Sequence, residues 1–351
     1  MKRGVLLTGF GGPDCLDAVE PFMCSLMSRE PAPELVESAK RRYLAIGGGS
    51  PLPMIAERIA AQLERELSGM PRAEMGEEDG TDGVGDYVAG RQPGLRAPEA
   101  GISIPVAVGM CHAEPSVERG VAELIGAGVR EIVMVSMSPY DSVHTTGTYR
   151  RVVEEAVAAH EGVTLVEAAH YHMAAPFIDV WTTDLVEQLH DIDILQNKTL
   201  VVFSAHSLPV ADVEADPAYV QQLRETARAV AESSGLGEPG AFDALGGIEA
   251  YGGPGVTAPW LLAFQSKGRT PGEWLGPDLD ETIDAAAAEG FRAVIVCPIG
   301  FITDHLETLY DIDIMAADRV LLADMEWARV RTPNDDQRMI EALASAVRAV
   351  I

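Results

Sequence analysis

The feature that most constrains the fold is a regular alternation of apolar runs with amphipathic stretches along the whole chain. Six runs rich in Val and Ile are typical of buried parallel strands, which are continuously apolar: 4–8, 104–109, 131–137, 164–167, 199–204 and 293–298. Stretches with helical periodicity lie between and after them at 34–43, 53–67, 116–127, 149–160, 176–190, 217–233, 278–289 and 338–350. This alternation predicts an α/β protein built of βαβ units. Since a domain has roughly 150 residues, two open sheets fit the 351 residues better than one.

The formal net charge of −28 argues against two classes of partner. Phosphate binding needs a basic surface, so nucleic acid is not an expected partner, and adsorption to anionic membrane is disfavoured for the same reason. No apolar run approaches the roughly 20 residues of a membrane span. The first apolar run meets the glycine turn at 11–12 too soon for a signal peptide. The four cysteines include no CxxC pair, which indicates a reducing compartment, and we expect a cytoplasmic protein.

The segment 71–101 is acidic and rich in glycine, with few apolar residues. Such a segment buries too little surface to order itself, so we expect a mobile surface loop. Two other glycine-rich turns, GFGGP at 9–13 and IGGGSPL at 46–52, follow early elements. Neither matches a nucleotide-binding motif. Each is interpreted either as a tight turn or as a place where the backbone approaches a flat ligand closely.

A buried strand ends in the sequence FSAHSLP, residues 203–209, and places His206 at its carboxyl end. In open α/β sheets, ligands bind beyond the carboxyl ends of the strands, so this is a place where chemistry is expected. A lone histidine in a polar turn is nevertheless more often structural. Spacing alone therefore leaves both interpretations of His206 open.

A second candidate is FITDHLETLYDID, residues 301–313, which also follows a buried strand. On an α-helix with about 3.6 residues per turn, Asp304, Glu307 and Asp311 share one face. Lys and Arg usually accompany acids on a solvated face, and this stretch contains neither. The helical pattern is expected to fail by Asp313, which would otherwise lie on the apolar stripe. The acidic face is as compatible with a solvated surface as with a functional site.

The two strand ends, one with an imidazole and one with carboxylates, could face each other across a cleft. Such a pair can move protons or bind a divalent cation of borderline hardness. A zinc hydrolase is the competing interpretation. It would normally show HExxH or another set of several histidines, and the sequence contains neither.

At these residues the sequence resembles the ferrochelatases, the enzymes that insert Fe(II) into a porphyrin. The matching segments run in order through nearly the whole chain: LLTGFGGPD near the N-terminus, RRYLAIGGGSPL at 41–52, GMCHAEPSVE at 109–118, FSAHSLP at 203–209, FQSKGRTPGEWLGPD at 264–278 and PIGFITDHLETLYDID at 298–313. FSAHSLP, DHLETLYD and IGGGSPL together are highly specific for this family. The short segment 21–43 most resembles the soluble Gram-positive enzymes, which act on coproporphyrin III, a porphyrin with four propionates.

The resemblance implies two Rossmann-like domains, each a parallel sheet flanked by helices, with a cleft between them. We expect residues 1–170 to form the N-terminal domain, completed by a C-terminal helix at 335–351. Residues 171–334 are expected to form the C-terminal domain, which carries both candidate site segments.

The resemblance also assigns roles. The family's invariant histidine matches His206 and its essential glutamate matches Glu307, so these two are the expected catalytic residues. Together with Asp311, which matches the family's acidic row, they are the expected ligands of the incoming metal. Met315, one turn after Asp311, is not an acid, so this chain departs from the fuller row of some members.

Six further positions are expected to bind the porphyrin ring or its propionates. They are Asp14, Arg29, Arg42, Ser50, His112 and Lys267. Asp14 lies where some relatives place a tyrosine that can reach the iron of bound product, so the resemblance does not extend to that contact. His112 is as compatible with a structural role as with lining the cleft.

The implied function is insertion of Fe(II) into coproporphyrin III to give coproheme III, by a lyase without a resident cofactor. No cysteine follows Cys297, so the [2Fe–2S] cluster of some relatives is not expected. The alternatives are a protoporphyrin IX ferrochelatase giving protohaem, a cobalt or nickel chelatase acting on sirohydrochlorin, and a non-catalytic haem-binding protein on the same fold. We expect a monomer whose partners are the porphyrin and Fe(II).

Overall fold

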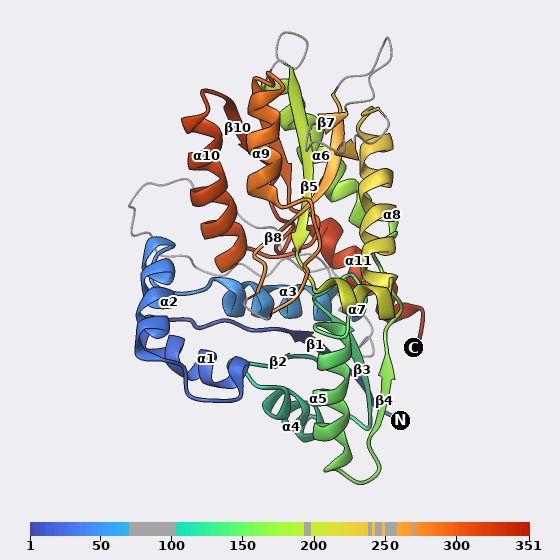
Figure 1. The fold of residues 1–351 in the computed structure, drawn as a ribbon. Helices are drawn as coiled ribbons and strands as arrows, with labels where there is room; N and C mark the ends of the chain where they lie inside the picture. Colours follow the sequence, from blue (N-terminus) through green and yellow to red (C-terminus); the bar gives the residue numbers. More distant parts are fainter. Residues whose placement is uncertain (70–102, 193–197, 238–240, 243–247, 250–257, 269–270) are drawn as a thin grey trace, which may run out of the picture.

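The computed structural model describes residues 1–69, 103–192, 198–237, 241–242, 248–249, 258–268 and 271–351 (Figure 1). The expected loop at 71–101 lies outside these residues. Within the described part, the strands form two four-stranded sheets and one short ribbon. No helix in this part of the chain is long and apolar enough to cross a membrane.

Both four-stranded sheets are parallel throughout. The first has the order β2-β1-β3-β4, with β1 (Arg3–Gly9), β2 (Val106–Met110), β3 (Glu131–Ser136) and β4 (Thr164–Glu167). The second has the order β10-β9-β5-β8, with β5 (Thr199–His206), β8 (Trp260–Gln265), β9 (Ala293–Cys297) and β10 (Glu326–Arg329). The ribbon pairs β6 (Ala241–Phe242) with β7 (Ile248–Glu249) in antiparallel fashion.

The helices follow the predicted alternation, with additions. They are η1 (Leu16–Ala18), α1 (Val19–Met27), α2 (Pro33–Ala45), α3 (Leu52–Leu67), α4 (Val117–Gly126), α5 (Thr146–Ala158), α6 (Ala175–Asp191), α7 (Val210–Ala215), α8 (Ala218–Ser233), α9 (Leu279–Ala288), η2 (Glu307–Ala316), α10 (Ala317–Leu322) and α11 (Gln337–Arg348). η1 is a 3-10 helix and η2 is a π-helix. The prediction did not include α1, α7 and α10.

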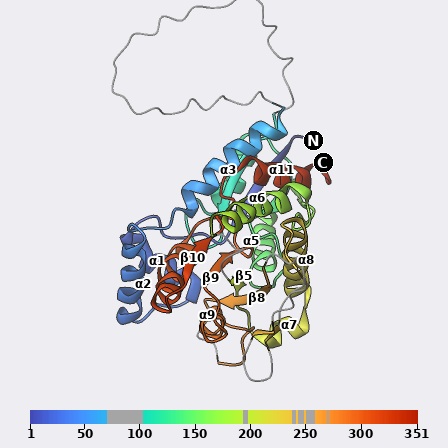
Figure 2. The same cartoon turned by 90° about the horizontal axis from the view of Figure 1, so that it is seen from above.

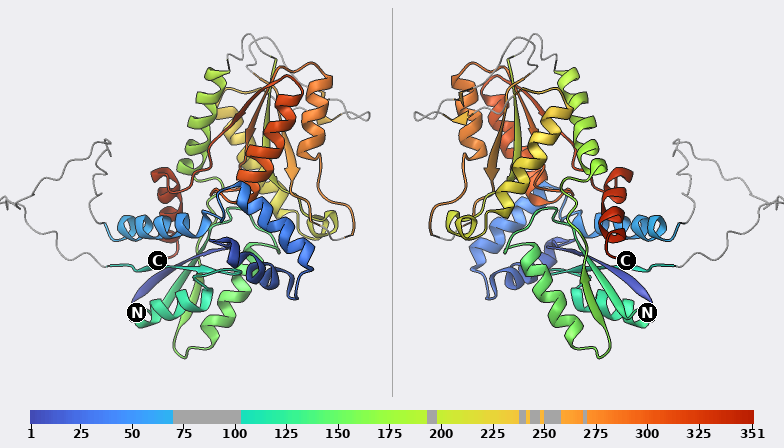
Figure 3. Two further views of the ribbon diagram at one scale, coloured as in Figure 1. Left: turned by 90° about the vertical axis from the view of Figure 1, so that its left-hand side faces the viewer. Right: turned by 90° about the vertical axis from the view of Figure 1, so that its right-hand side faces the viewer.

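The helices divide into outer and inner sets. α4 and α5 pack on the outer face of the first sheet, while α9, η2 and α10 pack on the outer face of the second. α3, α6, α8 and α11 contribute to one apolar core that also includes residues of both sheets. Figures 1 and 3 show the two sheets one above the other with α3 between them, and Figure 2 shows α11 close to α3 and α6. The predicted α/β class with two parallel sheets is confirmed.

A small separate cluster holds α1 and α2 together beside the site. Val19 and Met23 of α1 pack against Val36 and Tyr43 of α2, and Leu306 packs against this cluster from the segment before η2. The two helices thereby form a wall next to the acidic stretch that the sequence singled out.

Candidate active site

Two hollows open where the carboxyl ends of the sheets meet. The first, about 340 Å³, is bounded by the ends of β1 and β5 and by the segment after β3. The second, about 570 Å³, is bounded by α2, the end of β8 and η2. Both volumes are typical of small-molecule sites. The residues that line both hollows are Phe10, Gly11, His206, His305 and Glu307, so these stand at the junction of the two.

The structure brings His206 and Glu307 into contact. His206 is the last residue of β5 and Glu307 the first of η2. Nδ1 of His206 lies 2.9 Å from Oε2 of Glu307. The hydroxyl of Tyr219 donates to the main-chain carbonyl of His206 at 2.9 Å, which fixes the end of the strand that carries the imidazole.

A close backbone crossing holds the segment that leads to Glu307. The amide of Gly300 donates to the carbonyl of Ser204 at 3.0 Å. A Cβ at Gly300 would lie 2.6 Å from Cβ of Ala205, so only glycine allows this approach. The hydroxyl of Tyr140, which is fully buried, donates to the carbonyl of Ile299 at 3.0 Å and ties the same segment to the loop after β3.

Each member of the His206–Glu307 pair changes the other's protonation. Burial lowers the pKa of His206, but the charge and hydrogen bond of Glu307 together with the charge of Asp311 outweigh burial and raise the pKa above the ordinary imidazole value. Burial raises the pKa of Glu307, but the charge and hydrogen bond of His206 together with the charges of His305 and Arg42 outweigh it and lower the pKa to about 2. An opposite charge at hydrogen-bond distance favours the charged form of both groups. The pair therefore rests as an imidazolium beside a carboxylate.

η2 is a π-helix, whereas the sequence pattern predicts an α-helix. π-Helices are rare in proteins, and those that occur are often at functional sites. Asp311 lies one turn after Glu307; its Oδ1 accepts a hydrogen bond from Arg42, and its Oδ2 accepts one from the Ser266 hydroxyl at 2.6 Å. Burial raises the pKa of Asp311, against the opposing effects of Ser266 and Arg42.

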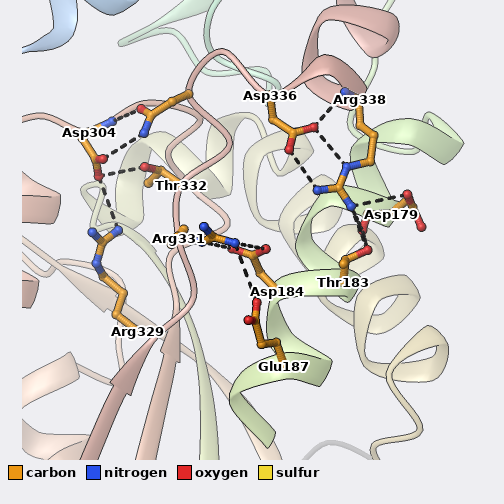
Figure 4. Close-up of polar contacts among 11 residues, drawn as sticks. Asp179, Thr183, Asp184, Glu187, Asp304, Arg329, Arg331, Thr332, Asp336 and Arg338 are labelled. Atoms are coloured by element: carbon orange, nitrogen blue, oxygen red, sulfur yellow. Dashed lines mark hydrogen bonds and ion pairs between the residues drawn. The ribbon is translucent and has the colours of Figure 1, made fainter. Parts of the chain in front are cut away.

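The prediction that Asp304 shares a face with Glu307 is wrong. Asp304 precedes η2, and its carboxylate accepts hydrogen bonds from Thr332 at 2.7 Å and from Asn334 at 2.9 Å (Figure 4). Arg329 lies 3.4 Å from the same carboxylate and pairs with Asp313 at 2.5 Å. The sequence pattern also predicts that the helix ends by Asp313, and this is wrong. The helix continues past Asp313, and the ion pair with Arg329 occupies the Asp313 carboxylate within η2.

Three of the six predicted porphyrin-binding residues line the second hollow. Arg42, Ser50 and Lys267 do so together with His206 and Glu307. Ser50 is buried, and Nζ of Lys267 lies 3.6 Å from Oδ2 of Asp278. The hollow thus combines cationic and hydroxyl donors with the histidine–glutamate pair.

Asp14, Arg29 and His112, although described by the structure, line neither hollow. Asp14 and Arg29 are exposed. Nδ1 of His112 lies 3.0 Å from Oγ of Ser25, and its ring packs against Phe10 with the centroids 4.8 Å apart. Burial lowers the pKa of His112, so its imidazole supports Phe10 in the neutral form.

Sequence reasoning missed three residues that line the first hollow. Phe10 directly follows β1, a position that could have identified it, and Trp274 lies in the segment after β8. His144 comes from the segment after β3, and its Nε2 lies 2.7 Å from Oδ2 of Asp212 in α7. The histidine and the aspartate join the two sides of this hollow, and no local sequence signal relates them.

In the described part of the chain, no group of three or more His, Cys, Asp or Glu side chains could hold a metal ion. His206 contacts Glu307, and Asp311 lies one turn after Glu307 along η2.

Comparisons with known proteins identify the family of this chain. A sequence model described as ferrochelatase matches residues 2–76 and 94–350. The coproporphyrin III ferrochelatase of Bacillus subtilis is 30% identical over 352 residues, covering 99% of this chain and 97% of its own length. That of a Geobacillus species is 29% identical, with coverage of 99% and 97%.

Among solved structures, SirB from Bacillus subtilis with Fe3+ matches 99% of this chain and 95% of its own with a TM-score of 0.51. At 11% identity, that likeness concerns the fold alone. The family match, by contrast, covers almost the whole sequence. The chain belongs to the ferrochelatase family.

Proposed function

We propose that this protein inserts Fe(II) into coproporphyrin III and releases coproheme III. The observation that carries the proposal is the contact of His206 with Glu307 at 2.9 Å, at the junction of two hollows. One hollow can take the ring and the other can admit the metal. The two side chains then stand where the centre of the ring and the cation meet.

The reaction needs a proton acceptor on the macrocycle side. A porphyrin carries two N–H protons in its plane, and both must leave before a metal can enter. Binding contacts at the rim of the ring can stabilise a bent form in which the nitrogen lone pairs point to one face. The neutral form of His206 can accept one of these protons, and Glu307 accepts the other or holds the arriving cation.

The first hollow suits a flat aromatic ring. Phe10 and Trp274 offer aromatic surfaces there, and His206 and Glu307 line the same hollow. Aromatic side chains pack well against extended π-systems. In this arrangement the ring nitrogens approach His206 and the edges of the ring reach the polar rim.

The number of donors around the ring favours four propionates over two. Arg42 and Lys267 line the second hollow, and Ser142, His144 and Thr145 line the first. Coproporphyrin III carries propionates on all four rings, so polar groups are needed on both sides. The curated relatives that match over almost the whole chain are named coproporphyrin III ferrochelatases, which also favours this substrate over protoporphyrin IX.

Fe(II) enters as a substrate, and its path is part of the proposal. Asp311 and Glu307 lie along η2 beside the second hollow. Fe(II) binds both carboxylate oxygen and imidazole nitrogen. Asp311 can receive the cation first and Glu307 and His206 can take it to the ring.

Anaerobic metallation of coproporphyrin III with Fe(II), followed by absorbance, tests the proposal. We expect turnover with the wild type and none with His206→Ala, while this variant still binds the porphyrin. Absence of turnover with coproporphyrin III would contradict the proposed activity. Faster turnover with protoporphyrin IX would favour that substrate, and wild-type rates in His206→Ala would refute the role of His206. The cytoplasmic location and the monomeric state stay predictions.

A further inference from the structure

The two permanent cations in the second hollow are already paired with carboxylates. Among the described residues that line the two hollows, Arg42 and Lys267 are the only arginine and lysine. Arg42 binds Asp311, and Lys267 lies 3.6 Å from Asp278. A substrate that brings carboxylates into this hollow must therefore compete with carboxylates of the protein.

The pair of Arg42 and Asp311 spans the hollow. Arg42 comes from α2 and Asp311 from η2. The guanidinium also lies over the ring of Tyr310, 4.9 Å from its centroid. The Arg42 side chain is 36% exposed and that of Asp311 is 16% exposed. The cation is thus the member of the pair that an incoming ligand reaches first.

Asp311 is not free to bind a metal in this state. One carboxylate oxygen accepts from Arg42 and the other from Ser266. A guanidinium in contact with the carboxylate also repels an approaching divalent cation. Met315 occupies the next turn of η2, so no acid at that position replaces Asp311. The state of Asp311 therefore decides how well this side of the hollow binds a cation.

We propose that Arg42 couples porphyrin binding to metal binding by exchanging one carboxylate for another, an inference that rests on the proposed function. A propionate of the porphyrin takes the guanidinium, which forms bidentate pairs with carboxylates. Asp311 is then released and becomes a ligand for the divalent cation. Arg42 acts as a positioning residue, because it changes the metal site through Asp311.

Such an exchange has a measurable signature. If the porphyrin raises the affinity for the metal, the metal raises the affinity for the porphyrin by the same factor. Couplings of this kind are roughly 5- to 150-fold in binding constants. The sequence of events that follows is porphyrin first and Fe(II) second along the favoured path.

The coupling can be measured without turnover. Mn(II), observed by electron paramagnetic resonance, reports cation binding. Zn(II) coproporphyrin III supplies the four propionates on a ring whose centre is already filled. Its tetramethyl ester is the matched control, since it has the same ring without the carboxylates. We expect the acid to tighten Mn(II) binding about tenfold and the ester to leave it unchanged.

Two variants test whether Arg42 is the residue that couples porphyrin binding to Mn(II) binding. In Arg42→Ala, Mn(II) should bind more tightly without any porphyrin, and Zn(II) coproporphyrin III should add no further tightening. Arg41→Ala removes the same charge from the neighbouring, exposed position on α2 and should behave as the wild type. Thermal unfolding followed by circular dichroism establishes that both variants are folded.

The outcomes separate this inference from the proposed function. Equal Mn(II) affinities with and without Zn(II) coproporphyrin III in the wild type would overturn the exchange. So would Mn(II) binding in Arg42→Ala that is no tighter than in Arg41→Ala. Either result leaves the proposed function intact if the wild type still metallates coproporphyrin III. Failure to turn over that substrate contradicts the proposed function itself.

Discussion

Replacement of Asp304 by alanine tests whether this residue anchors the start of η2 or conducts metal. Its side chain is 21% exposed, and its carboxylate accepts hydrogen bonds from Thr332 at 2.7 Å and Asn334 at 2.9 Å (Figure 4). A hydrogen bond to a charged group contributes about 1.5–3 kcal/mol, so loss of both costs about 3–5 kcal/mol after allowance for partial exposure. With about 2.1 cal/mol/K of unfolding entropy per residue, a single transition of 351 residues shifts in Tm by about 4–7 °C.

Differential scanning calorimetry of Asp304→Ala beside Asp318→Ala measures this shift. Asp318 is an exposed acid of α10, so its removal is the matched loss of one charge. A Tm no lower than that of Asp318→Ala would refute the anchoring role. A raised KM for Fe(II) at unchanged Tm would return Asp304 to the metal path that the sequence pattern predicts.

Three further changes follow from the geometry of the site. Metallation should accelerate with rising pH as His206 loses its proton. Because the Glu307 carboxylate raises the pKa of His206, Glu307→Gln should move the inflection of the residual pH–rate profile to lower pH. An unmoved inflection would contradict the coupling between the two residues. Trp274→Ala should weaken porphyrin binding, measured by fluorescence quenching, by about two- to tenfold, the value of one aromatic contact, while an unchanged Kd would remove Trp274 from the ring site. Gly300→Ala places a Cβ 2.6 Å from that of Ala205, and overpacking of roughly 1–3 kcal/mol should lower both Tm and kcat; a wild-type kcat would show that the crossing does not position Glu307.

The two central strands of the second sheet were predictable because burial on both sides leaves a continuous apolar run. All residues of β9 and all but the last of β5 are buried, and both runs are in the prediction. The edge strands of the same sheet, β8 and β10, are missing from the prediction. β10 is only four residues long and carries charged side chains at two positions, Glu326 and Arg329. Its identity as a strand depends on pairing with β9, which a single sequence does not reveal.

The contact between His206 and Glu307 was predictable from position, whereas the surroundings of that contact were not. His206 is the last residue of β5 and Glu307 follows the segment beyond β9, and the carboxyl ends of parallel strands meet at one edge of the sheet. The contacts of Arg42 with Asp311 and of His144 with Asp212 join segments far apart in the chain. They depend on how α2 and α7 pack, and no periodicity within one segment encodes that packing.

The acidic stretch shows why the sequence pattern placed two acids correctly on one face although it predicted the wrong type of helix. Residues four apart, such as Glu307 and Asp311, stay about one turn apart in an α-helix and in a helix with i→i+5 bonds. The two geometries diverge over longer separations, and an α-helical wheel also presumes that the helix extends to every residue projected on it. The helix does not extend to Asp304, because η2 begins at Glu307. Asp313 lies within η2, but the α-helical wheel places it wrongly, because it pairs with Arg329 instead of entering the apolar stripe. The spacing of the acids alone is therefore insufficient to predict that η2 is a π-helix.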